Sequence, residues 1–230
     1  NLPGIESGKV KLDAATLANI FRGAITKWND SAIAALNPGM TLPSTAITVV
    51  HRADGSGTTF VFTNYLALNS VSFRTEVGAD KEVNWPKGTL GGKGNAGVAA
   101  NVLKIAGAVG YVDYADAKKN NMKFAALKNR AGDFVLPTQE AMASAAANAD
   151  FKVRGMAPAI LDQPGAATWP IVSATFILGY QQGDAAKQES VKEFFKWSFE
   201  NGKTLAEELG FVALPPSVIK LVEAEMANLR

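Results

Sequence analysis

The sequence alternates short apolar, β-branched runs with segments of helical spacing, and this alternation is typical of α/β proteins. The clearest unit begins with a strand predicted over 46–50, continues into the loop H-R-A-D-G-S-G-T-T and ends in a helix predicted over 60–68. A chain of 230 residues has room for one large domain or two modest ones. The residues alone therefore predict an α/β fold.

The other segments follow the same alternation. The spacing predicts a helix over 13–21 capped by Asp13 and a second over 30–36 capped by Asp30. Further helices are expected over 97–104, 115–121, 138–149, 187–201, 203–209 and 217–229. Strands are expected over 108–114 and 169–180, a hairpin over 124–136, and a loop or interdomain crossing over 154–168. In the helix over 187–201, the residues expected to face the core are Val191, Phe194, Phe195, Trp197 and Ser198.

Composition excludes several classes of protein. The chain has no cysteine, which removes disulfides, thiolate nucleophiles and cysteine-based zinc sites. Its one histidine, His51, rules out a histidine-rich metal site, and any Ser-His-Asp triad would have to use it. With 23 basic and 21 acidic residues, the net charge of +2 gives no argument for a nucleic-acid partner. No apolar run approaches the roughly 20 residues that a membrane span needs.

The loop over 52–59 has the features of an anion site. A helix that follows a strand and a glycine loop presents free backbone amides and a partial positive charge at its first turn. Gly55 and Gly57 allow the backbone to turn and to approach a ligand closely. The hydroxyl groups that add further donors are those of Ser56, Thr58 and Thr59.

Arg52 adds a planar, permanently charged donor to this loop, and Asp54 is near enough in sequence to orient it. No lysine follows the glycines as in a nucleotide-binding P-loop, and no serine stands in nucleophile-elbow order. Donors without a base or a metal favour binding over turnover. From the residues alone, a plain capped helix is an equal alternative to an anion site.

A second glycine cluster, residues 92–97, fits the pattern G-x-G-x-x-G. A dinucleotide site also requires a preceding strand and an acidic residue about 20 positions further on. Residues 84–88 make a poor strand, and Asp113 falls inside a predicted strand. A glycine turn that feeds a helix beside the cleft is therefore favoured. His51, alone at a strand end, is expected to pack or to face solvent.

Longer stretches of the chain resemble a known family. The run R-A-D-G-S-G-T-T-F-V-F-T-N-Y-L starts at Arg52, and the stretches I-T-K-W-N-D, G-G-K-G-N-A-G, A-V-G-Y-V-D-Y and W-P-I-V-S-A-T-F-I-L occur around it. Together, and in this order, they resemble the periplasmic phosphate-binding proteins of bacterial phosphate ABC transporters. The resemblance covers essentially all 230 residues.

This resemblance implies a two-lobed α/β periplasmic-binding-protein fold of type II that closes on one phosphate in the interlobe cleft. By matching positions, Arg52 would make the charged contact, and Ser56, the Gly57 amide and Thr58 would donate hydrogen bonds. Asp54 would hold Arg52 in place. The family implies no catalytic residue, metal or cofactor, and a membrane permease as the partner that receives phosphate.

The chain also departs from the family, whose first strand–helix–strand–helix segment has no counterpart here. We expect residues 1–165 to form one complete lobe and residues 166–230 the crossover and the C-terminal part of the second. Apolar surface should then be exposed over 171–178 and 191–199, and a separate chain or a second copy would complete the truncated lobe. A start at Asn1 is expected of an exported, periplasmic protein whose signal peptide is not in this chain.

Two other functions stay open from the sequence. The first is an enzyme acting on phosphoesters through His51 or Asp54, for which turnover of a phosphate ester would be the sign. The second is an extracellular phosphate-binding scaffold outside transport, which no feature of the sequence separates from a transport protein.

Overall fold

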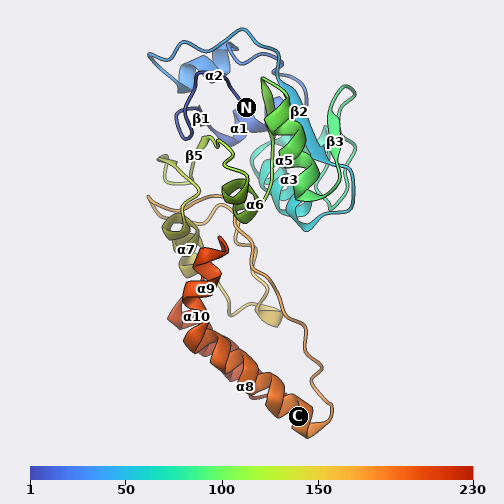
Figure 1. The fold of residues 1–230 in the computed structure, drawn as a ribbon, viewed down its shortest axis with the longest axis vertical. Helices are drawn as coiled ribbons and strands as arrows, with labels where there is room; N and C mark the ends of the chain where they lie inside the picture. The colour runs from blue at the N-terminus through green and yellow to red at the C-terminus, as the bar shows by residue number, and fades with distance from the viewer. Residues whose placement is uncertain (230) are drawn as a thin grey trace.

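The computed structural model describes residues 1–229 and has an elongated shape. Both sheets lie in the N-terminal part, at one end, and the C-terminal helices extend to the other end (Figure 1). Each sheet has three strands, in the orders β3-β2-β4 and β1-β5-β6. The α/β class predicted from the sequence is therefore confirmed.

The first sheet is parallel and centres on β2 (Thr48–Arg52). Its neighbours are β3 (Leu90–Gly92) on one side and β4 (Ala108–Gly110) on the other. Two helices, α3 (Gly57–Asn69) and α5 (Gly94–Lys104), follow β2 and β3. Because Arg52 pairs with Gly92, the loops that lead into these two helices open at the same edge of the sheet.

β3 corrects the sequence analysis, which placed no strand before the second glycine cluster. Its residues Leu-Gly-Gly have little intrinsic preference for a strand. The strand forms because it pairs with β2 in three registered positions. β4 is also shorter than predicted: Asp113 lies beyond it and caps α6 (Tyr114–Lys119).

The remaining helices of this part begin at the predicted caps. The Asp13 carboxylate accepts from the Thr16 amide at the start of α1 (Ala14–Phe21), and Asp30 accepts from Ala32 at the start of α2 (Ser31–Leu36). A short helix that was not predicted, α4 (Val71–Glu76), follows α3 and is capped by Ser70.

The second sheet pairs β1 (Lys11–Leu12) in parallel with β5 (Ala126–Lys128). β5 then pairs antiparallel with β6 (Phe134–Val135), which confirms the predicted hairpin. Helix α7 (Gln139–Asn148) follows within the range predicted for a helix, and its N-cap residue is Thr138.

The main core contains an aromatic cluster in which α1, α3 and the chain after β4 meet. The Phe62 ring stacks on Tyr111 with centroids 4.4 Å apart and meets Phe21 edge-on at 4.7 Å. Burial of each such ring stabilises the fold by about 1.5–3 kcal/mol. The cluster fixes α3, and with it the loop that precedes α3.

The segment 169–180 is not the strand that was predicted. Only one isolated bridge, Leu161 to Ile171, touches it, and within residues 1–229 it forms no ladder. An apolar run becomes a strand only where another strand can pair with it, so the sequence preference alone is not enough here. The side chains of Phe176, Ile177 and Leu178 are 46%, 64% and 95% exposed.

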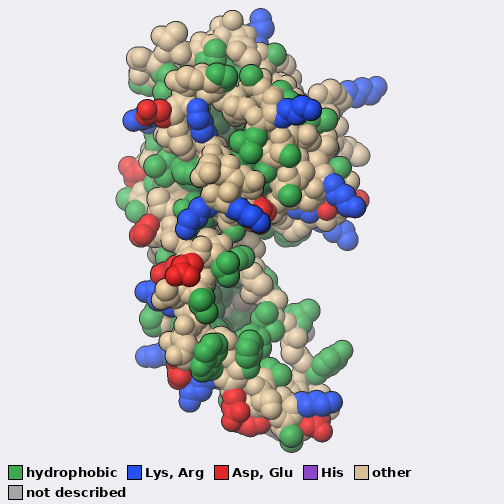
Figure 2. Space-filling view, viewed as in Figure 1, with side chains coloured by type: hydrophobic (Ala, Val, Ile, Leu, Met, Phe, Trp, Pro, Cys, Tyr) green, Lys and Arg blue, Asp and Glu red, His purple; other side chains and the backbone are tan. Residues whose placement is uncertain are grey.

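The C-terminal part consists of α8 (Ala185–Asn201), α9 (Lys203–Glu208) and α10 (Pro216–Met226). The predicted helices are confirmed, but the prediction that Val191, Phe194, Phe195, Trp197 and Ser198 face the core is wrong, because α8 buries none of its residues. The expected exposure of apolar side chains is observed over 176–178 and at Val191, Phe194 and Trp197, whereas Ile171 and Val172 pack against core clusters. Figure 2 shows hydrophobic side chains at this end of the molecule.

A separate core cluster lies where α7 meets the C-terminal part. It joins Ala145 of α7 and Phe151 to Ile160 and to Val218 of α10. The predicted loop over 154–168 contains a single short 3-10 turn, Arg154–Met156. The division of the chain into two units at residue 165 stays a prediction. Among residues 1–229, no helix is both long and apolar enough to cross a bilayer.

The close approach of β3 and α5 gives a test of the fold. A Cβ atom at Gly92 would lie 2.6 Å from the Gly97 carbonyl carbon and the Val98 nitrogen, both backbone atoms that cannot move alone. We expect Gly92→Ala to lower the free energy of unfolding by about 1–3 kcal/mol in urea denaturation. Gly57→Ala is the control, since a Cβ there meets nothing within 4 Å. Equal stabilities of the two variants would contradict this packing.

Candidate anion site

The loop after β2 leads into α3 through Ser56, which is the N-cap residue. The Ser56 Oγ accepts from the Thr59 amide at 3.1 Å, and the Ser56 amide donates to the Lys81 carbonyl at 3.1 Å. The capping role proposed as an alternative is thus real for Ser56. It uses only an acceptor position of the hydroxyl, so the Ser56 O–H can still donate to a ligand.

Further donors are free at the same helix end. The backbone amides of Gly57 and Thr58, and the Thr58 hydroxyl, have no hydrogen-bond acceptor among residues 1–229. They lie at the positive end of a helix of 13 residues. An anion seated there would receive several hydrogen bonds without displacing an existing one.

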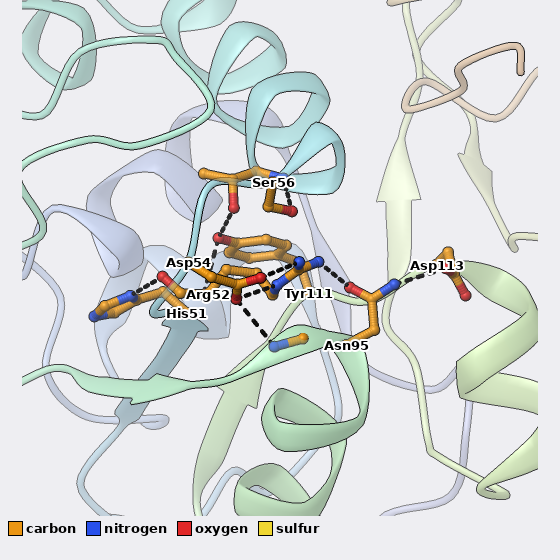
Figure 3. A network of polar contacts seen from close by, with 9 residues as sticks. His51, Arg52, Asp54, Ser56, Asn95, Tyr111 and Asp113 are labelled. Carbon is orange, nitrogen blue, oxygen red and sulfur yellow. Dashed lines mark hydrogen bonds and ion pairs between the residues drawn. The ribbon is translucent and has the colours of Figure 1, made fainter. Parts of the chain in front are cut away.

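Arg52 and Asp54 form a two-bond ion pair beside these donors (Figure 3). Arg52 Nε donates to Asp54 Oδ1 at 2.9 Å, and Nη2 donates to Oδ2 at 2.7 Å. The pKa of Asp54 is held well below its usual value, mainly by the hydrogen bonds from Arg52. A hydrogen bond from the Gly94 amide at 3.0 Å lowers this pKa further. The same pairing raises the pKa of Arg52, whose side chain is only 12% exposed. Both groups therefore stay charged at neutral pH.

Three residues that the sequence analysis did not assign to the site complete the network (Figure 3). Arg52 Nη1 donates to Asn95 Oδ1 at 2.8 Å, and Asn95 Nδ2 donates to Asp113 Oδ2 at 2.6 Å. The Tyr111 hydroxyl accepts from the Arg52 amide at 3.2 Å, and burial raises the pKa of Tyr111. The signal for Asn95 was its place in the second glycine cluster, but only the pairing of β3 with β2 brings that cluster to Arg52.

His51 points away from the donors in Figure 3. Its Nδ1–H donates to the Arg52 carbonyl at 2.9 Å, and its ring stacks on Trp85 with centroids 5.0 Å apart. This is the packing role expected for a lone histidine at a strand end. Among residues 1–229, no group of three His, Asp or Glu side chains is arranged to hold a metal ion.

Comparison with known proteins identifies the family. The model of the PBP superfamily domain matches residues 4–201. The phosphate-binding protein PstS of Xylella fastidiosa strain 9a5c is 49% identical over 99% of this chain and 63% of its own length. The PstS of Haemophilus influenzae is 43% identical over 98% of this chain and 68% of its own length. The chain belongs to the PstS family of the PBP superfamily.

Solved structures agree on the fold. A DING protein is 21% identical with a TM-score of 0.69, over 97% of this chain and 68% of that one. A human phosphate-binding apolipoprotein, with the same identity and coverage, has a TM-score of 0.68. The periplasmic-binding-protein fold implied by the resemblance is confirmed. The chain spans less than two thirds of the length of the first PstS relatives.

The ion pair predicts how stability depends on pH. The pKa of Asp54 is lowered on folding, so the pair stabilises the fold above the unfolded pKa of about 3.9 and loses this contribution as pH falls through the lower folded pKa. We expect Asp54→Asn to lower the free energy of unfolding at pH 7 and to matter much less at pH 2. Urea denaturation at both pH values is the measurement.

The matched control for that experiment is Glu200→Gln, an exposed carboxylate on α8. It should change stability little at either pH. A destabilisation by Asp54→Asn that is the same at pH 7 and pH 2 would contradict the charge-based account of the pair.

Proposed function

We propose that the protein binds inorganic phosphate in an interlobe cleft, at the loop between β2 and α3. Arg52 supplies the charged contact, and Ser56, the Gly57 amide and Thr58 supply hydrogen bonds. Asp54 is a supporting residue that orients Arg52. The proposal uses no metal, cofactor or catalytic residue.

The observation that carries this proposal is a surplus of donors at one point of the chain. The Arg52 guanidinium and the free donors at the start of α3 lie within seven residues of sequence. The nearby Asp54 carboxylate already accepts two hydrogen bonds from Arg52. Such a set suits a small, multiply charged oxyanion with several acceptor oxygens. The similarity to relatives named phosphate-binding protein PstS supports phosphate as that oxyanion.

The wider part of the proposal is transport. We place the protein outside the cytoplasmic membrane, in the periplasm, where it would deliver phosphate to the permease of an ABC transporter. Membership of a solute-binding family supports this role. An enzyme that uses His51 or Asp54 is disfavoured, because the first side chain packs on Trp85 and the second is held by Arg52.

Phosphate titration by calorimetry tests the assignment of the site. We expect Arg52→Ala to weaken phosphate binding by about 100-fold, or about 3 kcal/mol, because a charged hydrogen-bonding partner is lost. The control is Arg74→Ala, an exposed arginine on α4 that should leave affinity unchanged. Sulfate is titrated in parallel as the competing oxyanion. An unchanged phosphate affinity of Arg52→Ala would refute the site.

The proposal includes a partner for the C-terminal part. Val191, Phe194 and Trp197 of α8 are 41%, 60% and 56% exposed, and the neighbouring extended segment exposes further apolar side chains. An apolar surface of this kind is usually covered in a working protein. We assign the cover to a separate chain or to a second copy that completes the truncated lobe.

Sedimentation of the isolated 230-residue chain tests for the second copy. We expect a mass above the 24.2 kDa of one chain, and a shift toward the monomer in Trp197→Glu, because a charge would have to be buried in the contact. Glu200→Gln on the same helix is the control. A monomer at all concentrations would exclude the second copy as the cover.

A further inference from the structure

The second glycine cluster, residues 91–97, has no role in the function proposed so far, yet it contacts both members of the Arg52–Asp54 pair. The Gly94 amide donates to Asp54 Oδ1 at 3.0 Å, and Asn95 Oδ1 accepts from Arg52 Nη1 at 2.8 Å. We infer that Gly94 and Asn95 are positioning residues that fix the Arg52 guanidinium toward the anion. This inference rests on the proposed function and deepens it.

The direction of the Asn95 amide is set by its two partners. A guanidinium can only donate and a carboxylate can only accept, so Oδ1 must face Arg52 and Nδ2 must face Asp113. Asp113 is itself fixed, since its Oδ1 accepts from the Asp116 amide at 2.8 Å as the cap of α6. A continuous line of hydrogen bonds therefore runs from the start of α6 to Arg52.

The guanidinium is held on two sides and left open on the third. Asp54 accepts hydrogen bonds from Nε and from one N–H of Nη2, and Asn95 accepts one from Nη1. Since the group is a rigid plane with five N–H donors, these contacts fix its orientation and leave the other two N–H groups for a ligand. Asp54 alone would leave Nη1 without a fixed partner.

A neutral amide suits position 95 better than a carboxylate. An aspartate there would give Arg52 a second anionic partner and compete with a bound anion for its charge. It would also place a like charge against Asp113, to which Asn95 now donates at 2.6 Å. Asn95 therefore orients Arg52 and leaves Asp54 as the carboxylate that pairs with it directly.

The glycines give the backbone path that this arrangement needs. Gly94 has φ +65°, a conformation that residues with a side chain rarely adopt, and its amide meets Asp54 there. Gly92 lets α5 approach β3 within a distance that excludes a Cβ. The match to G-x-G-x-x-G is thereby explained by the support of an arginine, with no nucleotide involved.

Phosphate titration of the full-length protein tests the inference through a double-mutant cycle. We expect Asn95→Ala to weaken binding by about tenfold when Arg52 is present, and by less than twofold in the Arg52→Lys background. A residue that acts through the Arg52 guanidinium must lose its effect on phosphate affinity when lysine replaces the arginine. Asn101→Ala is the matched control on α5, because its side chain donates to the Gly91 carbonyl and should not change affinity.

Asn95→Asp is the second variant, since it keeps the side-chain shape if the alanine variant folds poorly. We expect it to bind phosphate more weakly than Asn95→Ala. Wild-type affinity in Asn95→Ala, an equal loss in both backgrounds, or tighter binding by Asn95→Asp than by Asn95→Ala overturns the inference alone. A wild-type protein that binds no phosphate removes the proposed function and the inference with it.

Discussion

The pairing of β2 with β3 is the constraint on which the candidate site depends. Its register sets Arg52 opposite Gly92, so the strand ends that feed α3 and α5 lie side by side. Two segments 40 residues apart in sequence then meet at Asp54 and Gly94. A shift by one position would move the amide of Gly94 away from the carboxylate and turn the side chains of β2 to the other face. The chemistry of the loop is therefore a property of the sheet as much as of its own residues.

In the proposed anion site, one carboxylate would support anion binding without opposing it. Asp54 is ionised, but its oxygens are occupied by Arg52 and the Gly94 amide. The pair fixes the guanidinium, whose remaining N–H groups would contact the anion, and the positive end of α3 would add to the attraction. This division explains why a carboxylate stands within a loop that is otherwise made of donors.

The sequence predicted local elements well where the signal was local. The caps Asp13 and Asp30, and the strand–loop–helix unit around Arg52, are set by neighbouring residues, and all are found in the structure. The wrong predictions concern segments whose structure depends on pairing with a strand distant in the sequence. β3 forms despite poor strand residues because β2 lies beside it, whereas 169–180 has strand residues but makes only one isolated bridge among residues 1–229. Asn95 joins the site through the pairing of β3 with β2, and Tyr111 through the pairing of β4 with β2. Neither long-range pairing can be predicted from the neighbouring residues.

The missing Cβ of Gly92 also sets where the molecule can bend. With backbone resting directly on backbone, β3 and the first turns of α5 have no intervening side chains that could re-pack to absorb a tilt. We therefore expect this edge of the sheet and the two glycine loops to behave as one rigid unit. A hinge motion in this protein would therefore have to occur outside this unit.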